Sequence, residues 1–235
     1  MPSYDLIVIS GVTRGLGAVL TEWLIDRRKT VVGCARSQAG IDALGRRFPS
    51  PNSFSEVDVV SAADVKQWAR SVVESSGVPD LVICNASICN DASKRSWELS
   101  DEEFDQVVAV NINGTANVCR AFLPEMVERG TGTLIGLSSR AGRKGLGNLA
   151  PYCAGKWGIE GFIKAVAREL PEGMASIAMN PGDINTDMFR SNWPDSAPDK
   201  PSAEEWVEIA GPFILGLGSE HNGESVTVPL PGYVL

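Results

Sequence analysis

The sequence predicts an α/β fold: one doubly wound domain over residues 1–235, with a parallel sheet of about seven strands and helices on both faces. Three observations predict it. Short apolar runs such as residues 6–9 and 81–84 have the composition of strands that are buried on both faces. Segments of helical periodicity separate these runs along the chain, which is the pattern of right-handed crossovers between parallel strands. A chain of 235 residues without repeats or a linker fits one domain.

The first half of the chain alternates regularly between the two periodicities. The run Leu6-Ile7-Val8-Ile9 is followed by a segment in which Leu16, Val19, Leu20, Trp23 and Leu24 fall on one helical stripe. A Pro/Ser/Asn-rich stretch near residue 50 predicts a loop before a short third strand. The elements expected here are strands at 6–9, 30–35, 54–57 and 81–84 and helices at 15–28, 39–48 and 62–75.

The second half repeats the alternation with longer helices. Ser100 and Glu103 form a capping-box pattern at the start of a helix that Gly114 is expected to bend. The stretch from Pro181 to Lys200 is rich in Asp, Asn and Pro and predicts a loop, with a substrate loop at about 187–202. The elements expected here are helices at 101–129, 149–170 and 203–217 and strands at 133–137, 175–179 and 225–228.

Composition excludes several classes of protein. With 21 basic against 29 acidic residues, the net charge of −8 disfavours binding to nucleic acid or to an acidic membrane surface. No apolar run reaches the length of a membrane span, and the N-terminus lacks the basic start of a signal peptide. Five cysteines without a CxxC pair, and a single histidine, favour reduced thiols and no metal site. These features indicate a cytoplasmic protein.

A glycine-rich turn connects the first expected strand to the first expected helix. It reads Ser10-Gly11-Val12-Thr13-Arg14-Gly15-Leu16-Gly17. Glycines let the backbone turn tightly and approach a pyrophosphate, which then lies at the positive end of the helix. Glycines also serve ordinary turns, so the position after the first strand is what makes this motif informative. The turn predicts a dinucleotide site that includes Gly11, Thr13, Arg14, Gly15, Leu16 and Gly17.

Further motifs follow this turn in order, and together they resemble the short-chain dehydrogenase/reductase family over about residues 4 to 190. The glycine motif begins with Ser10 where the family usually has Thr, and Cys84-Asn85-Ala86-Ser87 resembles the family's NNAG element with both ends altered. The other motifs that match the family are Asn111, the serine segment 138–142, the YxxxK motif formed by Tyr152 and Lys156, and Pro181-Gly182 followed by Ile184 and Thr186. The resemblance implies a Rossmann fold and a nicotinamide cofactor.

Tyr152 and Lys156 can be interpreted from their spacing alone. Residues i and i+4 meet on one face of a helix. A free tyrosine has a pKa of about 10. One cation about 4 Å away at an effective dielectric near 20 contributes on the order of 4 kcal/mol, about three pKa units. We therefore expect Lys156 to lower the pKa of Tyr152, although a Tyr/Lys pair on a solvated helix face is the plainer alternative.

The resemblance implies a catalytic role for four residues. Ser139, rather than Ser138, stands at the family's distance before Tyr152 and would stabilise the developing oxyanion of the substrate. Tyr152 would deliver or remove the proton, and Lys156 would hold the nicotinamide ribose and tune the tyrosine. Asn111 would hold a water in the proton relay. The cofactor-binding residues implied in the same way include Asn85, Ala86, Tyr152, Lys156, Pro181, Gly182, Ile184 and Thr186.

The end of the second expected strand indicates the choice of cofactor. Ala35 stands where enzymes selective for NAD(H) place an acidic residue, and Arg36 follows it directly. Arg36 and Arg14 together suit a 2′-phosphate, with Ser37 as a further donor, so we expect NADP(H). The alternative is that both arginines are solvated surface residues. By resemblance, Asp58 and Val59 would flank the adenine.

The substrate pocket of the family would here be formed by residues 87–91, 140–149 and 187–199. These segments offer a mostly apolar lining, although a basic cluster of Arg140, Arg143 and Lys144 leaves an anionic substrate open. The resemblance also implies a homodimer through the helices at 101–129 and 149–170, while prolines near the C-terminus make a tetramer doubtful. The expected apolar or polar pocket residues are Leu146, Asn148, Met188, Phe189 and Trp193.

These observations predict an NADP(H)-dependent oxidoreductase of the carbonyl reductase or alcohol dehydrogenase type. It would transfer hydride between the nicotinamide and a carbonyl or secondary alcohol of a small, mostly apolar substrate. One alternative is an enzyme of the same fold in a biosynthetic tailoring step. The other is a non-catalytic NADP(H)-binding sensor, which the altered residues Ser10, Cys84 and Ser87 favour and the complete catalytic set opposes.

Overall fold

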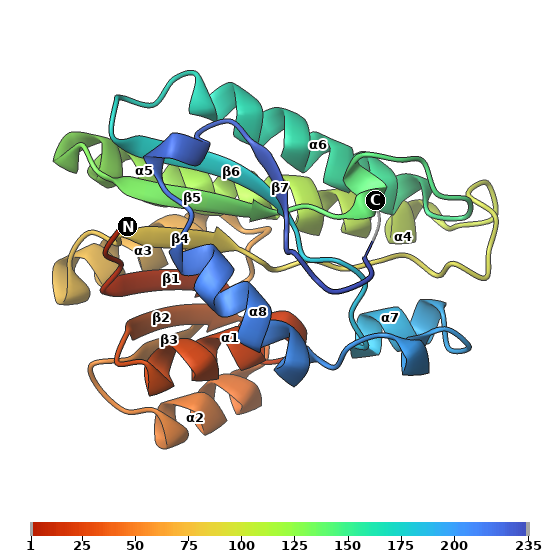
Figure 1. The fold of residues 1–235 in the computed structure, drawn as a ribbon, viewed down its shortest axis with the longest axis horizontal. Helices are drawn as coiled ribbons and strands as arrows, with labels where there is room; N and C mark the ends of the chain where they lie inside the picture. The colour runs from red at the N-terminus through yellow and green to blue at the C-terminus, as the bar shows by residue number, and fades with distance from the viewer. Residues whose placement is uncertain (1, 234–235) are drawn as a thin grey trace.

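The computed structural model describes residues 2–233 and confirms the α/β class. Its sheet has seven parallel strands in the order β3-β2-β1-β4-β5-β6-β7 (Figure 1). The order reverses between β1 and β4, and such a switch opens a crevice at the carboxyl ends of the strands. The strands are β1 (Leu6–Ser10), β2 (Thr30–Ala35), β3 (Ser53–Glu56), β4 (Leu81–Cys84), β5 (Gly132–Leu137), β6 (Met174–Asn180) and β7 (Ser225–Thr227).

Helices cover both faces of the sheet, and their bounds agree with the periodicity to within a few residues. Figure 1 shows α1, α2 and α8 on one side and α3, α5 and α6 on the other. No helix within residues 2–233 is both long and apolar enough to cross a membrane. The helices are α1 (Gly15–Asp26), α2 (Gln38–Arg47), α3 (Ala62–Ser76), α4 (Asp101–Val108), α5 (Thr115–Arg129), α6 (Ala150–Ala167), α7 (Asp187–Asn192) and α8 (Ala203–Leu215).

Two segments differ from the sequence prediction. The single helix expected over 101–129 is divided into α4 and α5 by one π-helical stretch, η1 (Ala109–Gly114), which contains Asn111. The segment 187–192, predicted as loop, forms the short helix α7, because the Thr186 side chain caps it by accepting a hydrogen bond from the Phe189 N–H at 3.3 Å. Both segments border the site described below.

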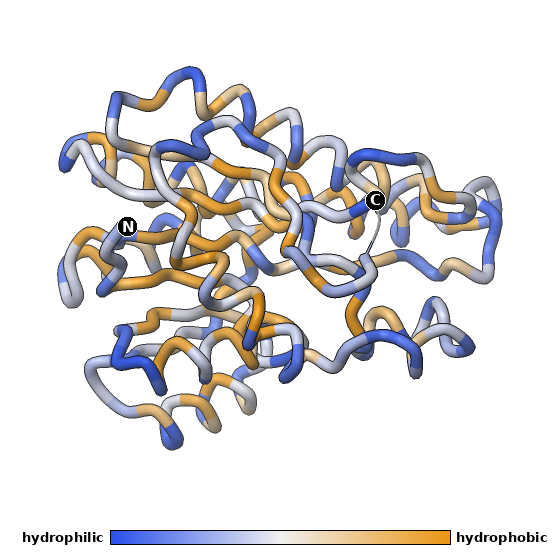
Figure 2. Tube along the Cα trace, viewed as in Figure 1, coloured by the Kyte–Doolittle hydropathy of each residue, from blue (hydrophilic) through white to orange (hydrophobic). Residues whose placement is uncertain are grey.

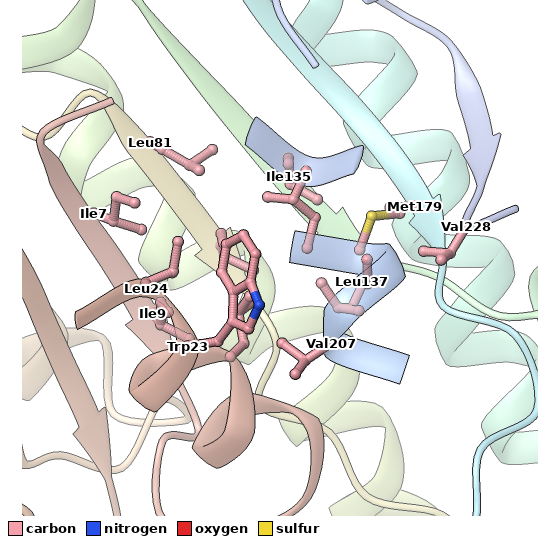
Figure 3. Packing of buried hydrophobic residues seen from close by; sticks show 14 of the residues in the cluster. Ile7, Ile9, Trp23, Leu24, Leu81, Ile135, Leu137, Met179, Val207 and Val228 are labelled. Carbon is pink, nitrogen blue, oxygen red and sulfur yellow. The ribbon is translucent and has the colours of Figure 1, made fainter. Parts of the chain in front are cut away.

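The core has two layers because successive strand residues point to opposite faces. In β1, Ile7 and Ile9 pack toward α1 and α8, whereas Leu6 and Val8 pack toward α3, α5 and α6. Figure 3 shows Trp23 of α1 among the strand residues of the first layer. Along the chain trace, apolar residues concentrate in the strands and on the inner helix faces (Figure 2). The sheet is thereby a rigid support for the loops at its carboxyl edge.

Candidate active site

One large cavity, of about 1140 Å³, runs along the carboxyl ends of the strands. Its lining includes residues that follow each of β1 to β6, so it lies at the switch point of the sheet. Of the catalytic and cofactor-binding residues predicted from sequence, all of them within residues 2–233, only Gly17 and Asn111 are outside this lining. Those that line it are Gly11, Thr13, Arg14, Gly15, Leu16, Arg36, Ser37, Asp58, Val59, Asn85, Ala86, Ser139, Tyr152, Lys156, Pro181, Gly182, Ile184 and Thr186.

The glycine turn forms a tight cradle at one end of the cavity. Gly11 has a φ of +80°, and a Cβ at Gly17 would collide with the Gly11 carbonyl oxygen. Ser10 ties the turn to the neighbouring strand, because its hydroxyl accepts hydrogen bonds from the backbone N–H groups of Asn85 and Ala86, both at 3.1 Å. In return, the Asn85 side-chain amide donates hydrogen bonds to the carbonyls of Ser10 and Gly11. The serine that departs from the family motif therefore has a defined structural task.

Two arginines stand beside this cradle with their charges available. Arg14 and Arg36 are exposed, and both line the cavity together with Ser37. Within residues 2–233 neither arginine forms a salt bridge. The Ser37 hydroxyl accepts a hydrogen bond from the Gly40 N–H at 3.2 Å as the cap of α2, which leaves its proton free to donate. This corner is built to receive an anion.

The loop after β3 forms the wall next to this corner. The Asp58 carboxylate accepts a hydrogen bond from the Val60 N–H at 3.0 Å, and Val59 is buried. The Asn117 amide of α5 donates to the carbonyls of Val59 and Val60 and fixes the loop. Asp58 and Val59 thus present a carboxylate and an apolar side chain to the same stretch of the cavity.

Tyr152 and Lys156 lie one turn apart on α6, as their spacing predicts. Lys156 is 2% exposed, and its Nζ donates to the Leu137 carbonyl oxygen at 2.7 Å and lies 5.5 Å from the centroid of the Tyr152 ring. Burial lowers the pKa of Lys156 to about 8. Ser139 hydrogen-bonds to the Tyr152 side chain. The three side chains therefore meet in one corner of the cavity.

The expected lowering of the Tyr152 pKa does not occur in this structure. Burial raises the pKa of Tyr152, and proximity to the Cys89 thiol raises it further, whereas the hydrogen bond with Ser139 acts in the opposite direction. The prediction from spacing fails because it ignored desolvation of the buried phenol. Here the Lys156 ammonium is directed to a backbone carbonyl instead.

Asn111 lies behind the cavity wall and is fully buried in the π-helical stretch. Its side-chain oxygen accepts hydrogen bonds from the Ser87 hydroxyl at 3.0 Å and the Ile88 N–H at 2.9 Å, and its amide donates to the Ile88 carbonyl at 2.9 Å. The side-chain oxygen and one of the two amide N–H groups of Asn111 thus hold the loop after β4.

The part of the cavity next to α7 is lined by the expected apolar residues, with one correction. Leu146, Met188, Phe189 and Trp193 line it, and the rings of Phe189 and Trp193 stand 5.0 Å apart at a 39° tilt. Asn148 does not line it. Its side chain donates to a backbone carbonyl of the preceding loop instead.

The basic cluster expected after Ser139 does not exist as a cluster. Arg140 forms an ion pair with Asp183 at 3.4 Å, and Arg143 forms one with Glu160 at 2.9 Å. Asp183 lines the cavity and was not singled out from sequence, although it directly follows Gly182. The cavity consequently presents an Arg–Asp pair of balanced charge, which does not favour an anionic substrate.

The chain is similar in sequence and in structure to known proteins over most of its length. A family model described as short chain dehydrogenase matches residues 5–197. An NADPH-dependent pterin aldehyde reductase of Arabidopsis thaliana is 43% identical over 224 residues, 94% of this chain and 92% of that protein. Among solved structures, a short chain dehydrogenase from Pseudomonas syringae has a TM-score of 0.85 at 26% identity and covers 97% of both chains. An actinorhodin polyketide ketoreductase with NADPH has the same TM-score and coverage at 25% identity.

Proposed function

The chain belongs to the short-chain dehydrogenase/reductase family of oxidoreductases, and from that membership we propose that it is an NADPH-dependent carbonyl reductase that acts on a pterin aldehyde. The observation that carries the proposal is one continuous cavity that joins an arginine-lined anion corner to Tyr152 and to an aromatic pocket. Similarity to the Arabidopsis thaliana reductase over 94% of the chain supports the same substrate class.

The residues of the cavity fit NADP(H). The cradle between Gly11 and Gly17 would receive the pyrophosphate at the N-terminus of α1, and Asp58 with Val59 would flank the adenine. Arg14 and Arg36 would hold the 2′-phosphate, which NAD(H) lacks. When bound, the reduced cofactor supplies the hydride that the carbonyl carbon receives.

The chain itself supplies the proton and the electrostatic stabilisation. The Ser139 hydroxyl would donate a hydrogen bond to the substrate carbonyl oxygen and stabilise the charge that develops there. Tyr152 would then donate its phenol proton to that oxygen. The phenol is protonated at neutral pH, which is the state that a proton donor requires, and its raised pKa makes it a weaker acid than a free tyrosine. Lys156, whose Nζ donates to the Leu137 carbonyl, would hold the nicotinamide ribose rather than lower the pKa of the tyrosine.

The part of the cavity next to α7 has side chains that can hold a pterin ring. Phe189 and Trp193 offer aromatic faces against which a planar bicyclic ring can pack. The edge of a pterin carries amino and ring N–H donors beside a carbonyl acceptor. The Asp183 carboxylate would accept from those donors, and the Arg140 guanidinium would donate to the carbonyl. A plain hydrocarbon ketone would offer these two groups one acceptor at most and no donor, so it would leave them little beyond the ion pair that they form with each other.

The test is consumption of NADPH by the purified protein with a pterin aldehyde, a plain aromatic aldehyde and an aliphatic ketone, with NADH in parallel. We expect the pterin aldehyde and NADPH to be preferred, and Tyr152→Phe to lose about 10²-fold or more of the rate while it still binds NADPH. Turnover of the plain aldehyde alone would refute the pterin assignment. NADPH binding without turnover of any substrate would refute catalysis and favour a sensor.

We also propose that the protein is a cytoplasmic homodimer. All five cysteines are free thiols, which suits a reducing compartment. Phe104 of α4 and Trp157 of α6 are 42% and 53% exposed, and large apolar side chains on neighbouring helices suit an interface between copies. Analytical ultracentrifugation of the wild type and of Trp157→Glu tests this, and a wild type that sediments as a monomer would refute it.

A further inference from the structure

A third residue continues the line of Tyr152 and Lys156 on α6. Glu160 lies one more turn along the helix, so the three side chains occupy positions i, i+4 and i+8 of one face. The Glu160 side chain is only 7% exposed, which is unusual for a carboxylate. Nothing in the proposed chemistry requires a buried negative charge at this position, so its contacts need an explanation.

The contacts of the Glu160 carboxylate join α6 to other parts of the chain, apart from one to Lys164 on α6 itself. One oxygen accepts hydrogen bonds from the Ser138 hydroxyl at 2.6 Å and from Arg143 Nε at 2.9 Å. The other oxygen accepts from the Ser225 hydroxyl of β7 and lies 3.8 Å from Lys164 Nζ. Burial by itself raises the pKa of Glu160, but the hydrogen bonds from Ser138, Ser225 and Arg143 hold it below the usual value. The carboxylate is therefore ionised at neutral pH.

Arg143 extends this contact to the edge of the sheet. Its guanidinium donates through Nη1 to the Thr227 hydroxyl at 2.9 Å and through Nη2 to the Val226 carbonyl at 2.7 Å. Both acceptors belong to β7. Glu160 and Arg143 thus connect α6, the turn after β5 and β7 in one buried network.

The segment that this network holds is the one that carries Ser139. Residue 137 is bound through its carbonyl by Lys156, and Ser138 is bound through its hydroxyl by Glu160. Gly142 closes the turn so tightly that a Cβ there would lie 2.6 Å from the Ser138 hydroxyl and 2.8 Å from the Lys156 carbonyl oxygen. The Ser139 hydroxyl accepts a hydrogen bond from the Ala141 N–H at 3.2 Å, and the Ser139 carbonyl accepts one from the Gly142 N–H at 2.9 Å. Its position therefore depends on the neighbours that α6 fixes.

We propose that Glu160, assisted by Arg143, is a positioning residue that acts through Ser138 to set the Ser139 hydroxyl against Tyr152. The inference rests on the proposed function for the roles of Ser139 and Tyr152. A buried ion pair of this kind adds little net stability compared with apolar residues of the same volume, so stability alone does not explain it. Fixing the geometry of one hydroxyl does, since a displacement of about 1 Å can cost about 10²-fold in rate.

The test uses three variants: Ser138→Ala, Glu160→Gln and the double variant that combines these two substitutions. A separate variant, Glu169→Gln, is the control. Glu169 is an exposed carboxylate just beyond the end of the same helix. For the carbonyl that the wild type reduces fastest, we expect each single variant to lose about tenfold or more in kcat. The dissociation constant for NADPH should change less than twofold. The kcat of the double variant should be no lower than that of the slower single variant, because both substitutions break the same connection.

A second readout does not depend on turnover. The chain has three tyrosines, so tyrosine labelled with ¹³C at Cζ gives few signals, and Tyr152→Phe assigns the one of interest. We expect the Tyr152 signal to move in Ser138→Ala and Glu160→Gln and to stay in Glu169→Gln.

The outcomes separate the two proposals. A wild type that reduces no carbonyl refutes the proposed function, and the Tyr152 signal still decides on the positioning role. Unchanged kcat and an unchanged Tyr152 signal in Ser138→Ala would overturn the positioning role even if Glu160→Gln unfolds. Losses in kcat that multiply in the double variant would overturn it as well.

Discussion

Raising the pH should stabilise the wild-type protein relative to Lys156→Met. Burial lowers the pKa of Lys156 from 10.5 to about 8 in the folded chain. Between these two values the unfolded chain holds a proton that the folded chain has released. Unfolding then takes up a proton, so a higher pH disfavours unfolding, and the free energy of unfolding rises with pH in this window.

The size of the effect follows from the shift. At about 1.4 kcal/mol per pKa unit, the shift from 10.5 to about 8 corresponds to about 3 kcal/mol once the pH exceeds both values. About 2 kcal/mol of this should be present at about pH 9.5 and almost none at about pH 7. Lys156→Met also loses the hydrogen bond to the Leu137 carbonyl. Neutral lysine still donates this bond, so its loss lowers the free energy of unfolding of the variant by the same amount at every pH.

The assay is reversible urea unfolding of both proteins, with reductant and without cofactor, at several values between about pH 7 and about pH 9.5. Subtracting the variant from the wild type removes every other titrating group. The free energy of unfolding of the wild type minus that of the variant should increase by about 2 kcal/mol from the lowest to the highest pH. Parallel stability curves over this range would refute a depressed pKa for Lys156.

Three further predictions concern the cavity. Arg14→Ala or Arg36→Ala should raise KM for NADPH about tenfold and leave KM for NADH unchanged, because each removes a charge-assisted hydrogen bond to the phosphate; equal effects on both cofactors would contradict the assignment. Gly17→Ala should abolish NADPH binding in fluorescence titrations because the new Cβ collides with the loop, whereas Gly161→Ala, where a Cβ meets open space, should bind normally and gain up to about 1 kcal/mol of stability. Asp183→Asn should raise KM for a pterin aldehyde about tenfold but not for a plain aromatic aldehyde, and a uniform loss in steady-state kinetics would count against recognition of the pterin edge.

The sequence was sufficient to predict which segments along the chain form the strands, because parallel strands buried on both faces must be apolar throughout. Runs such as those of β1 and β4 leave no other interpretation when helical segments separate them. The helix α7 was missed because its six residues are mostly polar and carry no apolar stripe. Its formation depends on the Thr186 cap and on contact between Phe189 and Trp193, which are local and tertiary details.

The location of the candidate site was also predictable, because motifs that follow successive parallel strands must meet at one edge of the sheet. The pairing of its charges was not. Arg140 and Arg143 are close in sequence, yet their partners Asp183 and Glu160 come from segments far along the chain. Proximity in sequence suggested a positive cluster, while the fold neutralises each arginine separately.

The pKa of Tyr152 shows what spacing on a helix can and cannot predict. Desolvation raises it, with the neighbouring Cys89 thiol as a second cause, and Lys156 is turned toward the carbonyl of Leu137. A phenol with a raised pKa stays protonated at neutral pH but is a weaker acid than a free tyrosine. Because one residue would donate the proton in reduction and remove it in oxidation, this pKa favours neither direction of the reaction. The i, i+4 spacing therefore predicts that Tyr152 and Lys156 share one face of α6, whereas the acidity of the phenol depends on burial, which the sequence spacing does not contain.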